Sequence, residues 1–168
     1  MTTTYTGSQS AGSATINNNS AYPYTYFYDT STADHADIIN NNGYTYFYDT
    51  STADNATINN FGGSGTHFYN TSTAGSATIN NSGYSYTSYG NTQFNGTSTA
   101  GSATINNDGG HTIFYDTSTA GHASITNNSQ FGTYFNNTST AGSATITTNS
   151  GGGTYFNNTS TPGNARAR

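Results

Sequence analysis

The chain has 168 residues, of which 30% are hydrophobic and 5% are charged, and its net charge at pH 7 is −5. It contains no Cys, Lys or Glu, and its only arginines are Arg166 and Arg168. These features exclude a disulfide framework, cysteine metal sites and a basic patch for nucleic acid.

The composition indicates β-structure rather than disorder. Disordered chains combine low hydrophobicity with high net charge, and this chain has few charges. Thr, Tyr and Phe are frequent and only two prolines occur, which favours strands. No apolar run is long enough for a membrane-spanning helix, so we expect no membrane insertion. The opening residues MTTTYTGSQS lack a charged and an apolar region, so they predict no signal peptide.

A segment Thr-Ser-Thr-Ala recurs along the whole chain, with small variations in its first and last copies. Its last threonine, which is serine in the first copy, is followed by the next after 22, 20, 21, 26, 20, 21 and 21 residues. A fixed period of this size is typical of solenoids, in which each repeat stacks on its neighbours. The eight anchor positions are Ser10, Thr32, Thr52, Thr73, Thr99, Thr119, Thr140 and Thr161.

Two apolar positions keep a constant distance from the anchor. From the second copy on a Phe precedes it by five residues, and in the first seven copies an Ile follows it by six. All length variation lies between the Ile and the next Phe. A slip of one residue would move every strand side chain to the opposite face, so constant spacing indicates paired strands. We therefore predict two core columns, which are Phe27, Phe47, Phe68, Phe94, Phe114, Phe135 and Phe156, and Ile16, Ile38, Ile58, Ile79, Ile105, Ile125 and Ile146.

Each repeat alternates apolar or small residues with Thr, Tyr or Asn, as strands do. Glycines after the anchor, such as Gly75 and Gly101, predict a corner with unusual dihedral angles, and Asn pairs such as Asn80–Asn81 predict a second corner. We predict an all-β parallel β-solenoid (β-helix) of about eight rungs of about 21 residues, forming a single domain over 1–168. Its winding is expected to be right-handed, and its longest loop is 80–93. Stacked Asn side chains would pass amide hydrogen bonds from rung to rung.

The unit F-x-D-T-S-T-A-G-x-A-T-I-x-N resembles the repeats of large bacterial surface proteins of the autotransporter and β-strand-repeat type. The resemblance covers Gln9 to Gly163. It implies a place outside the cell or at a bacterial cell surface, with roles in surface structure and adhesion.

No catalytic, cofactor-binding or metal-binding residue is expected. Polar residues repeat along this chain, whereas enzymes place single residues in a pocket. Asp34, His35, Asp37 and Asp54 lie in neighbouring rungs and offer oxygen ligands suited to Ca²⁺. Other copies have Gly or Ser at equivalent positions, so we interpret the four as solvated corner residues. His67 and His111 lie in or beside variable loops, and we expect them to be solvated as well.

The two threonines of each Thr-Ser-Thr segment share one parity, so both are expected to point outward from a strand. The resulting array resembles the ice-binding face of insect β-solenoid antifreeze proteins, which gives ice binding as an alternative function. The other interpretation is that Thr is simply a good exposed strand residue. The array comprises Thr30, Thr32, Thr50, Thr52, Thr71, Thr73, Thr97, Thr99, Thr117, Thr119, Thr138, Thr140, Thr159 and Thr161.

Tyrosines recur in matching places, for example Tyr26 and Tyr46, and cross-strand stacking that stabilises the ladder is their favoured role. They could also bind sugars together with the loop 80–93, which gives a glycan-binding adhesin as a further alternative.

The main interpretation is a non-enzymatic structural scaffold. Its partner is another copy of itself, because the two edges of a solenoid need caps and the sequence suggests none. End-to-end filaments would then form, with Arg166 and Arg168 as candidate junction residues.

Overall fold

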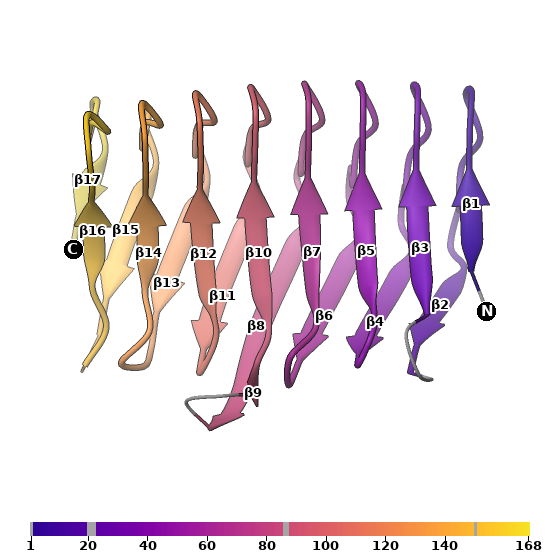
Figure 1. The fold of residues 1–168 in the computed structure, drawn as a ribbon, viewed down its shortest axis with the longest axis horizontal. Coiled ribbons are helices and arrows are strands. Elements are labelled where there is room, and N and C mark those ends of the chain that lie inside the picture. Colours follow the sequence, from indigo (N-terminus) through magenta and orange to yellow (C-terminus); the bar gives the residue numbers. More distant parts are fainter. Residues whose placement is uncertain (1, 20–22, 86–87, 150) are drawn as a thin grey trace.

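The computed structural model describes residues 2–19, 23–85, 88–149 and 151–168. Its strands alternate along the chain between two long sheets on two sides of a solenoid (Figure 1). Every pairing between successive turns within these two sheets is parallel, and no helix occurs in the described residues. The predicted all-β parallel β-solenoid is therefore confirmed.

The first sheet has eight strands, stacked in chain order. They are β1 (Thr3–Tyr5), β3 (Tyr24–Phe27), β5 (Tyr44–Phe47), β7 (Gly65–Phe68), β10 (Asn91–Phe94), β12 (His111–Phe114), β14 (Thr133–Phe135) and β16 (Thr154–Phe156). The second sheet comprises β2 (Thr15–Asn18), β4 (Asp37–Asn41), β6 (Thr57–Phe61), β8 (Thr78–Ser85), β11 (Thr104–Asp108), β13 (Ser124–Asn127), β15 (Thr145–Thr148) and β17 (Arg166–Ala167).

The path of the chain is right-handed, as expected. In Figure 1 the near strands, such as β3 and β5, run upward, and the fainter strands behind them, such as β4 and β6, run downward. Successive turns advance from the N-terminus at the right to the C-terminus at the left. A chain that rises in front, descends behind and advances to the left forms a right-handed coil.

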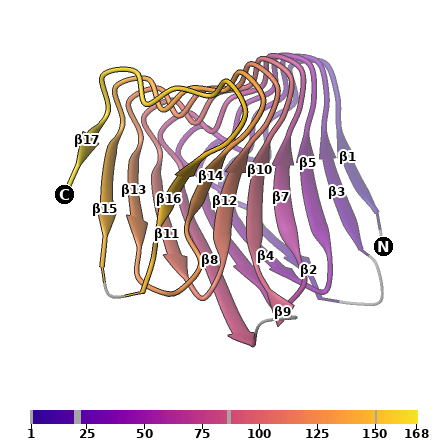
Figure 2. The same ribbon diagram turned by 60° about the vertical axis from the view of Figure 1, so that its left-hand side comes forward.

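A third, very narrow ladder joins the two sheets. The anchor residues pair from turn to turn as single parallel bridges, for example Thr32 with Thr52 and Thr99 with Thr119. A corner lies on each side of the anchor, and the stacked corner segments form the upper edge of Figure 2. One turn therefore consists of a first-sheet strand, a corner, one bridge residue, a second corner and a second-sheet strand.

Both corners use left-handed backbone at one position in every turn. The corner after the anchor has positive φ at Gly12, Asp34, Asp54, Gly75, Gly101, Gly121, Gly142 and Gly163, so the predicted glycine corner is confirmed. The corner before the anchor has positive φ at Gly7, Asp29, Asp49, Asn70, Gly96, Asp116, Asn137 and Asn158. Gly, Asn and Asp are the residues that adopt this region most readily, which explains why the repeat uses only these three there.

The expectation that the Asn pairs form a corner is wrong. Asn59 and Asn60 lie inside strand β6, and Asn80 and Asn81 lie inside β8. Because side chains alternate along a strand, the second Asn of each pair points into the core and the first lies on the outer face. The inward residues form a buried amide ladder, which comprises Asn18, Asn40, Asn60, Asn81, Asn107 and Asn127.

The core consists of columns that run the length of the solenoid. Phe27, Phe47, Phe68, Phe94, Phe114 and Phe135 have no exposed surface, and neighbouring rings stack with centroids 4.7–4.8 Å apart. Ile38, Ile58, Ile79, Ile105 and Ile125 are equally buried, Ile16 and Ile146 nearly so. Phe156, in the last turn, keeps 39% of its surface exposed. Alanine and serine columns beside the anchor, and a threonine column led by Thr25, fill the remaining interior.

The longest repeat departs from the pattern only in its variable segment. Strand β8 continues beyond its neighbours and pairs antiparallel with β9 (Ser88–Tyr89). The segment 80–93, expected to be a loop, is therefore largely strand, since 80–85 belong to β8, 88–89 to β9 and 91–93 to β10. The paired ends of β8 and β9 form a hairpin that projects beyond the lower edge of the solenoid in Figure 1. Residues 86–87 lie outside the described residues.

Candidate functional site

The first threonine of each Thr-Ser-Thr segment lies in a corner rather than on a strand. Asp29, immediately before Thr30, has a φ of 57°, which turns the chain at that point. The Thr30 hydroxyl donates a hydrogen bond of 3.0 Å to the carbonyl oxygen of Gly7 in the preceding turn. The same bond, of 2.8–3.0 Å, recurs at Thr50, Thr71, Thr97, Thr117, Thr138 and Thr159.

The second threonine is the bridge residue of the narrow ladder and is half-buried, except for the exposed Thr161. Its hydroxyl oxygen accepts a hydrogen bond from the backbone N–H two residues further on, at 2.9 Å between Thr32 and Asp34. The same bond, of 3.0–3.1 Å, holds the corner at Thr52, Thr73, Thr99, Thr119 and Thr140. Thr161 instead donates to the Thr140 hydroxyl at 3.2 Å. The predicted array therefore consists of two columns in different backbone settings, and both use their hydroxyls to build the corner.

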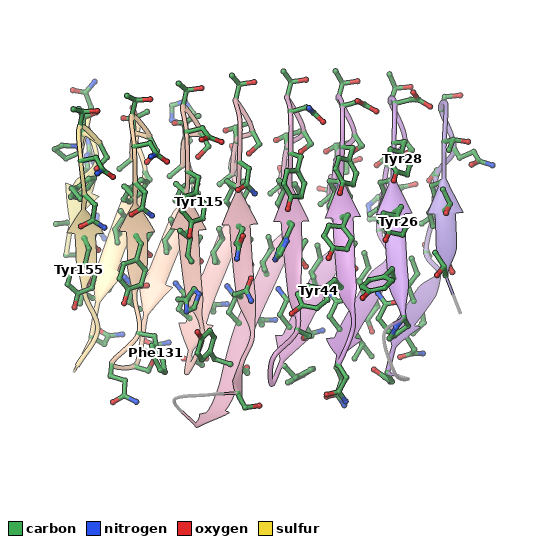
Figure 3. All side chains as sticks on the ribbon, viewed as in Figure 1. Tyr26, Tyr28, Tyr44, Tyr115, Phe131 and Tyr155 are labelled. Atoms are coloured by element: carbon green, nitrogen blue, oxygen red, sulfur yellow. The ribbon has the colours of Figure 1, made fainter. Side chains whose placement is uncertain are left out.

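Tyrosines cover the outer face of the second, third and fourth turns. Tyr28, Tyr48 and Tyr69 stack with centroids 5.0 Å apart, and Tyr26 stacks on Tyr46 at 5.2 Å. Partial burial in this stack, together with neighbouring tyrosines, raises the pKa of Tyr48 to about 12. Figure 3 shows Tyr26, Tyr28 and Tyr44 on the near face of the first sheet. Such cross-strand pairs stabilise a sheet, which is the role expected for these residues.

The aromatic face is interrupted near the middle of the solenoid. The column that contains Tyr26 and Tyr46 continues through His67, Gln93 and Ile113 before tyrosine returns at Tyr134. At the Ile113 end of this interruption lies an open groove of about 360 Å³. Its lining residues are Tyr89, His111, Ile113, Tyr115, Phe131, Tyr134 and Asn136.

The expectation that His67 and His111 are solvated is wrong. His111 is the first residue of β12 and is only 9% exposed, because the ring of Tyr89 lies 4.6 Å from its own. This burial lowers the pKa of His111 to about 4, so the imidazole is neutral at pH 7. His67 lies in the tyrosine column, with Asn91 Oδ1 3.2 Å from its Nε2. Burial lowers the pKa of His67 as well.

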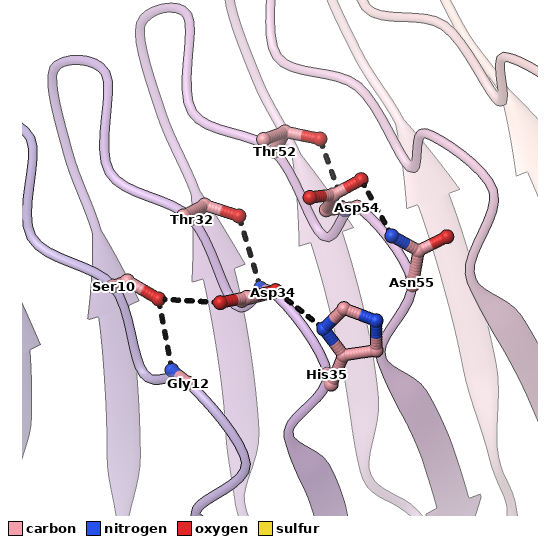
Figure 4. A network of polar contacts seen from close by, with 8 residues as sticks. All are labelled: Ser10, Gly12, Thr32, Asp34, His35, Thr52, Asp54 and Asn55. Atoms are coloured by element: carbon pink, nitrogen blue, oxygen red, sulfur yellow. Dashed lines mark hydrogen bonds and ion pairs between the residues drawn. The ribbon is translucent and has the colours of Figure 1, made fainter.

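The acidic residues of the second and third turns do not meet in one site. Asp34 accepts a 3.0 Å hydrogen bond from Ser10 and lies 2.5 Å from His35 Nδ1, while Asp54 binds Asn55 (Figure 4). These contacts, led by the His35 hydrogen bond, lower the pKa of Asp34. Asp37 lies on β4 and faces Asn59. Among the residues that the structure describes, no cluster of three or more acidic or histidine side chains is arranged to hold a metal ion.

The two end turns differ in their core residues. In the first turn Tyr5 occupies the phenylalanine column, with its ring 4.6 Å from that of Phe27. In the last turn Phe156, Ala165 and Ala167 border a cavity of about 250 Å³ together with Ile146 of the preceding turn. Arg166 lies in β17 next to this cavity and is exposed. Within the described ranges the one ion pair is His35–Asp34, so neither arginine has a carboxylate partner there.

Sequence reasoning located the repeated columns but missed the groove. Its residues come from different repeats, and Phe131 and Tyr89 lie in variable segments that align with no other copy. The usable signal was the break in the tyrosine pattern at Gln93 and Ile113.

In the described part of the chain, no helix has the length and apolarity needed to cross a membrane. No family model, no curated protein and no solved structure matches this chain.

Proposed function

We propose that this chain is a non-enzymatic structural protein, a stiff β-solenoid scaffold whose turns continue from one copy to the next. The observation that carries this proposal is the continuity of its side-chain columns from turn to turn. Stacked phenylalanines, buried asparagines and corner threonines each link a turn to the one before it. Repeated polar groups are thus committed to joining turns, which is what a scaffold requires.

The threonine columns support this role more than ice binding. An ice-binding array would present its hydroxyls to the solvent in a flat lattice. Here the Thr117 hydroxyl donates to the carbonyl oxygen of Gly96, and the Thr119 hydroxyl accepts from the Gly121 N–H. Both hydroxyls therefore stabilise the corner itself. Ice binding is the alternative function, and an ice-shaping assay distinguishes it from the scaffold.

The first and last turns are complementary in register. If the ladder continued beyond the last turn, β1 of a second copy would pair with β16, and Tyr5 would stack on Phe156 as it now stacks on Phe27. Strand β2 would pair with β17, which places Ile16 beside Ala167. This contact would cover the exposed ring of Phe156 and satisfy the outer backbone groups of both strands.

The charges at this junction are also complementary. In the continued register Arg166 would lie beside Thr15 of the second copy and two strands from its Asp37, a distance of about 10 Å between backbones at the usual strand spacing. An extended arginine side chain spans most of that distance. Arg166 would therefore lie close to Asp37 in the acidic second turn of the second copy, with Arg168 two residues further along the chain.

Electron microscopy and sedimentation velocity at a low and a high protein concentration test the proposal. We expect the wild-type protein to form rods that lengthen as the protein concentration rises. The Phe156→Asp variant should form only short rods at both concentrations. Tyr155→Asp is the matched control, because Tyr155 is 45% exposed on the same strand but points to the outer face. Replacing both arginines by serine should raise the concentration needed for assembly. A wild-type chain that stays a single short rod, or Phe156→Asp filaments like those of the control, would refute the assembly.

A further inference from the structure

The groove over Ile113 is formed by side chains from two neighbouring turns and from the hairpin. Ile113 of β12 has Tyr134 of β14 as its partner in the next strand. Tyr89 reaches the groove only because β8 and β9 fold back as a hairpin in the longest repeat. Figure 3 shows Phe131 at the lower ends of these strands and Tyr115 toward their upper ends. The hairpin thus encloses one side of a hollow that the regular repeat would not contain.

The rings of the groove are tilted, unlike those of the column formed by Tyr28, Tyr48 and Tyr69. Tyr89 makes angles of 51° with His111 and 42° with Phe131, and His111 lies at 84° to Tyr134. In that column, by contrast, Tyr28 and Tyr48 are almost parallel, with 10° between their planes. Tilted rings expose their faces to a common space, so a ligand between them can contact several aromatic surfaces at once.

The lining chemistry is apolar and uncharged, with polar groups at a few places. No Asp or Arg lines the groove, and the imidazole of His111 is neutral at pH 7 because burial lowers its pKa. The phenol groups of Tyr115 and Tyr134 and the side-chain amide of Asn136 supply hydrogen-bond donors and acceptors. The groove volume of about 360 Å³ falls within the range of small-molecule sites.

We propose that this groove binds a neutral sugar residue of a glycan chain, with the aromatic rings against its C–H faces and the Tyr and Asn groups on its hydroxyls. A pyranose ring combines an apolar face with a rim of hydroxyls, which matches this lining. The open shape of the groove lets a chain continue on either side. A ligand with a net negative charge is disfavoured, because no cation lies in the groove and the protein carries a net charge of −5.

Calorimetric titration with soluble cellohexaose, chitohexaose and maltohexaose tests this site, at protein concentrations below those at which assembly is detected. At least one of the three should bind in a saturable way. Ile113→Tyr should weaken binding at least about ten-fold, because it continues the tyrosine column into the hollow. Tyr134→Ala should weaken it similarly by removing one wall. Circular dichroism verifies that each variant keeps the fold.

Tyr46→Ala is the matched control, since Tyr46 stacks on the same face but lies outside the groove. It should bind as the wild type does. Equal losses in Tyr46→Ala and Tyr134→Ala would overturn the site in favour of general binding to exposed tyrosines. Binding of choline chloride without sugar binding would overturn it in favour of an ammonium cage. Absence of binding to all three oligosaccharides would overturn the proposal itself. These readouts are independent of filament formation.

Discussion

The side-chain amide of Asn40 donates a hydrogen bond of 2.8 Å to the side-chain oxygen of Asn60, although neither residue has any exposed surface. Asn60 in turn donates to Asn81 at 2.9 Å, and its oxygen also accepts from the Thr66 hydroxyl. Each amide thus uses both its donor and its acceptor inside the core. A ladder of this kind fixes register, because a displaced strand would leave several buried polar groups without partners.

Replacing Asn60 by Ala should destabilise the fold strongly. The change removes the acceptor of Asn40 and Thr66 and the donor to Asn81, and each buried group left unsatisfied costs about 1–3 kcal/mol. Urea unfolding followed by circular dichroism measures the loss. Asn59→Ala is the matched control, because Asn59 is the neighbouring outer residue of β6 and bonds to Asn80 on the half-exposed face. Equal losses in the two variants would contradict the role assigned to the buried ladder.

The architecture could be predicted from the sequence because every repeat carries the same pattern. Phe and Ile at fixed distances from Thr32 and its equivalents define which side chains face inward and which strands are in register. The Asn pairs were misplaced because Asn suits left-handed corners and also stacked amide ladders, and only the tertiary pairing distinguishes these. The groove could not be predicted, since the position of Tyr89 depends on how a unique hairpin folds back.

The corner threonines should contribute to stability through their hydroxyls. Thr117→Val keeps the shape of the side chain but removes the bond to Gly96, which should cost about 1 kcal/mol. Thr119→Val removes the acceptor of the Gly121 N–H and should cost at least as much. Urea unfolding of the two variants and the wild type gives both values. Unchanged stability in both variants would show that these hydroxyls are not needed for the corner.

Ice shaping and thermal hysteresis distinguish the scaffold from the ice-binding alternative. Because the hydroxyls of Thr99 and Thr119 accept hydrogen bonds within their own corners, we expect no ice shaping by the wild type. Faceted ice crystals would contradict this expectation. Their loss in Thr99→Lys and Thr119→Lys variants that retain the fold would then locate ice binding on the threonine columns.

Acid should destabilise the fold through His111. Its pKa is about 4 in the folded chain and about 6.5 in an unfolded one, so protonation favours unfolding. The stabilisation is therefore complete above about pH 6.5 and is lost as the pH falls towards 4, by up to about 3 kcal/mol. Urea unfolding across this range should show a steeper pH dependence for the wild type than for His111→Gln. Identical pH profiles would contradict a buried neutral imidazole at this position. Protonation of Asp34, whose pKa is lowered, affects stability only at lower pH.

Asn137 lies in the left-handed corner before the anchor, and different substitutions there should differ clearly in their effect on stability. This residue has a φ of 58°, and its side-chain oxygen accepts the backbone N–H of Asp116 at 3.1 Å. Asn137→Gly loses that bond but keeps the dihedral angles without strain, as Gly96 does at the equivalent place. Asn137→Val loses the same bond and adds left-handed strain of about 1–2 kcal/mol. The difference in unfolding free energy between the two variants isolates the backbone contribution. If valine were as stable as glycine here, left-handed geometry would not be what restricts this corner to Gly, Asn and Asp.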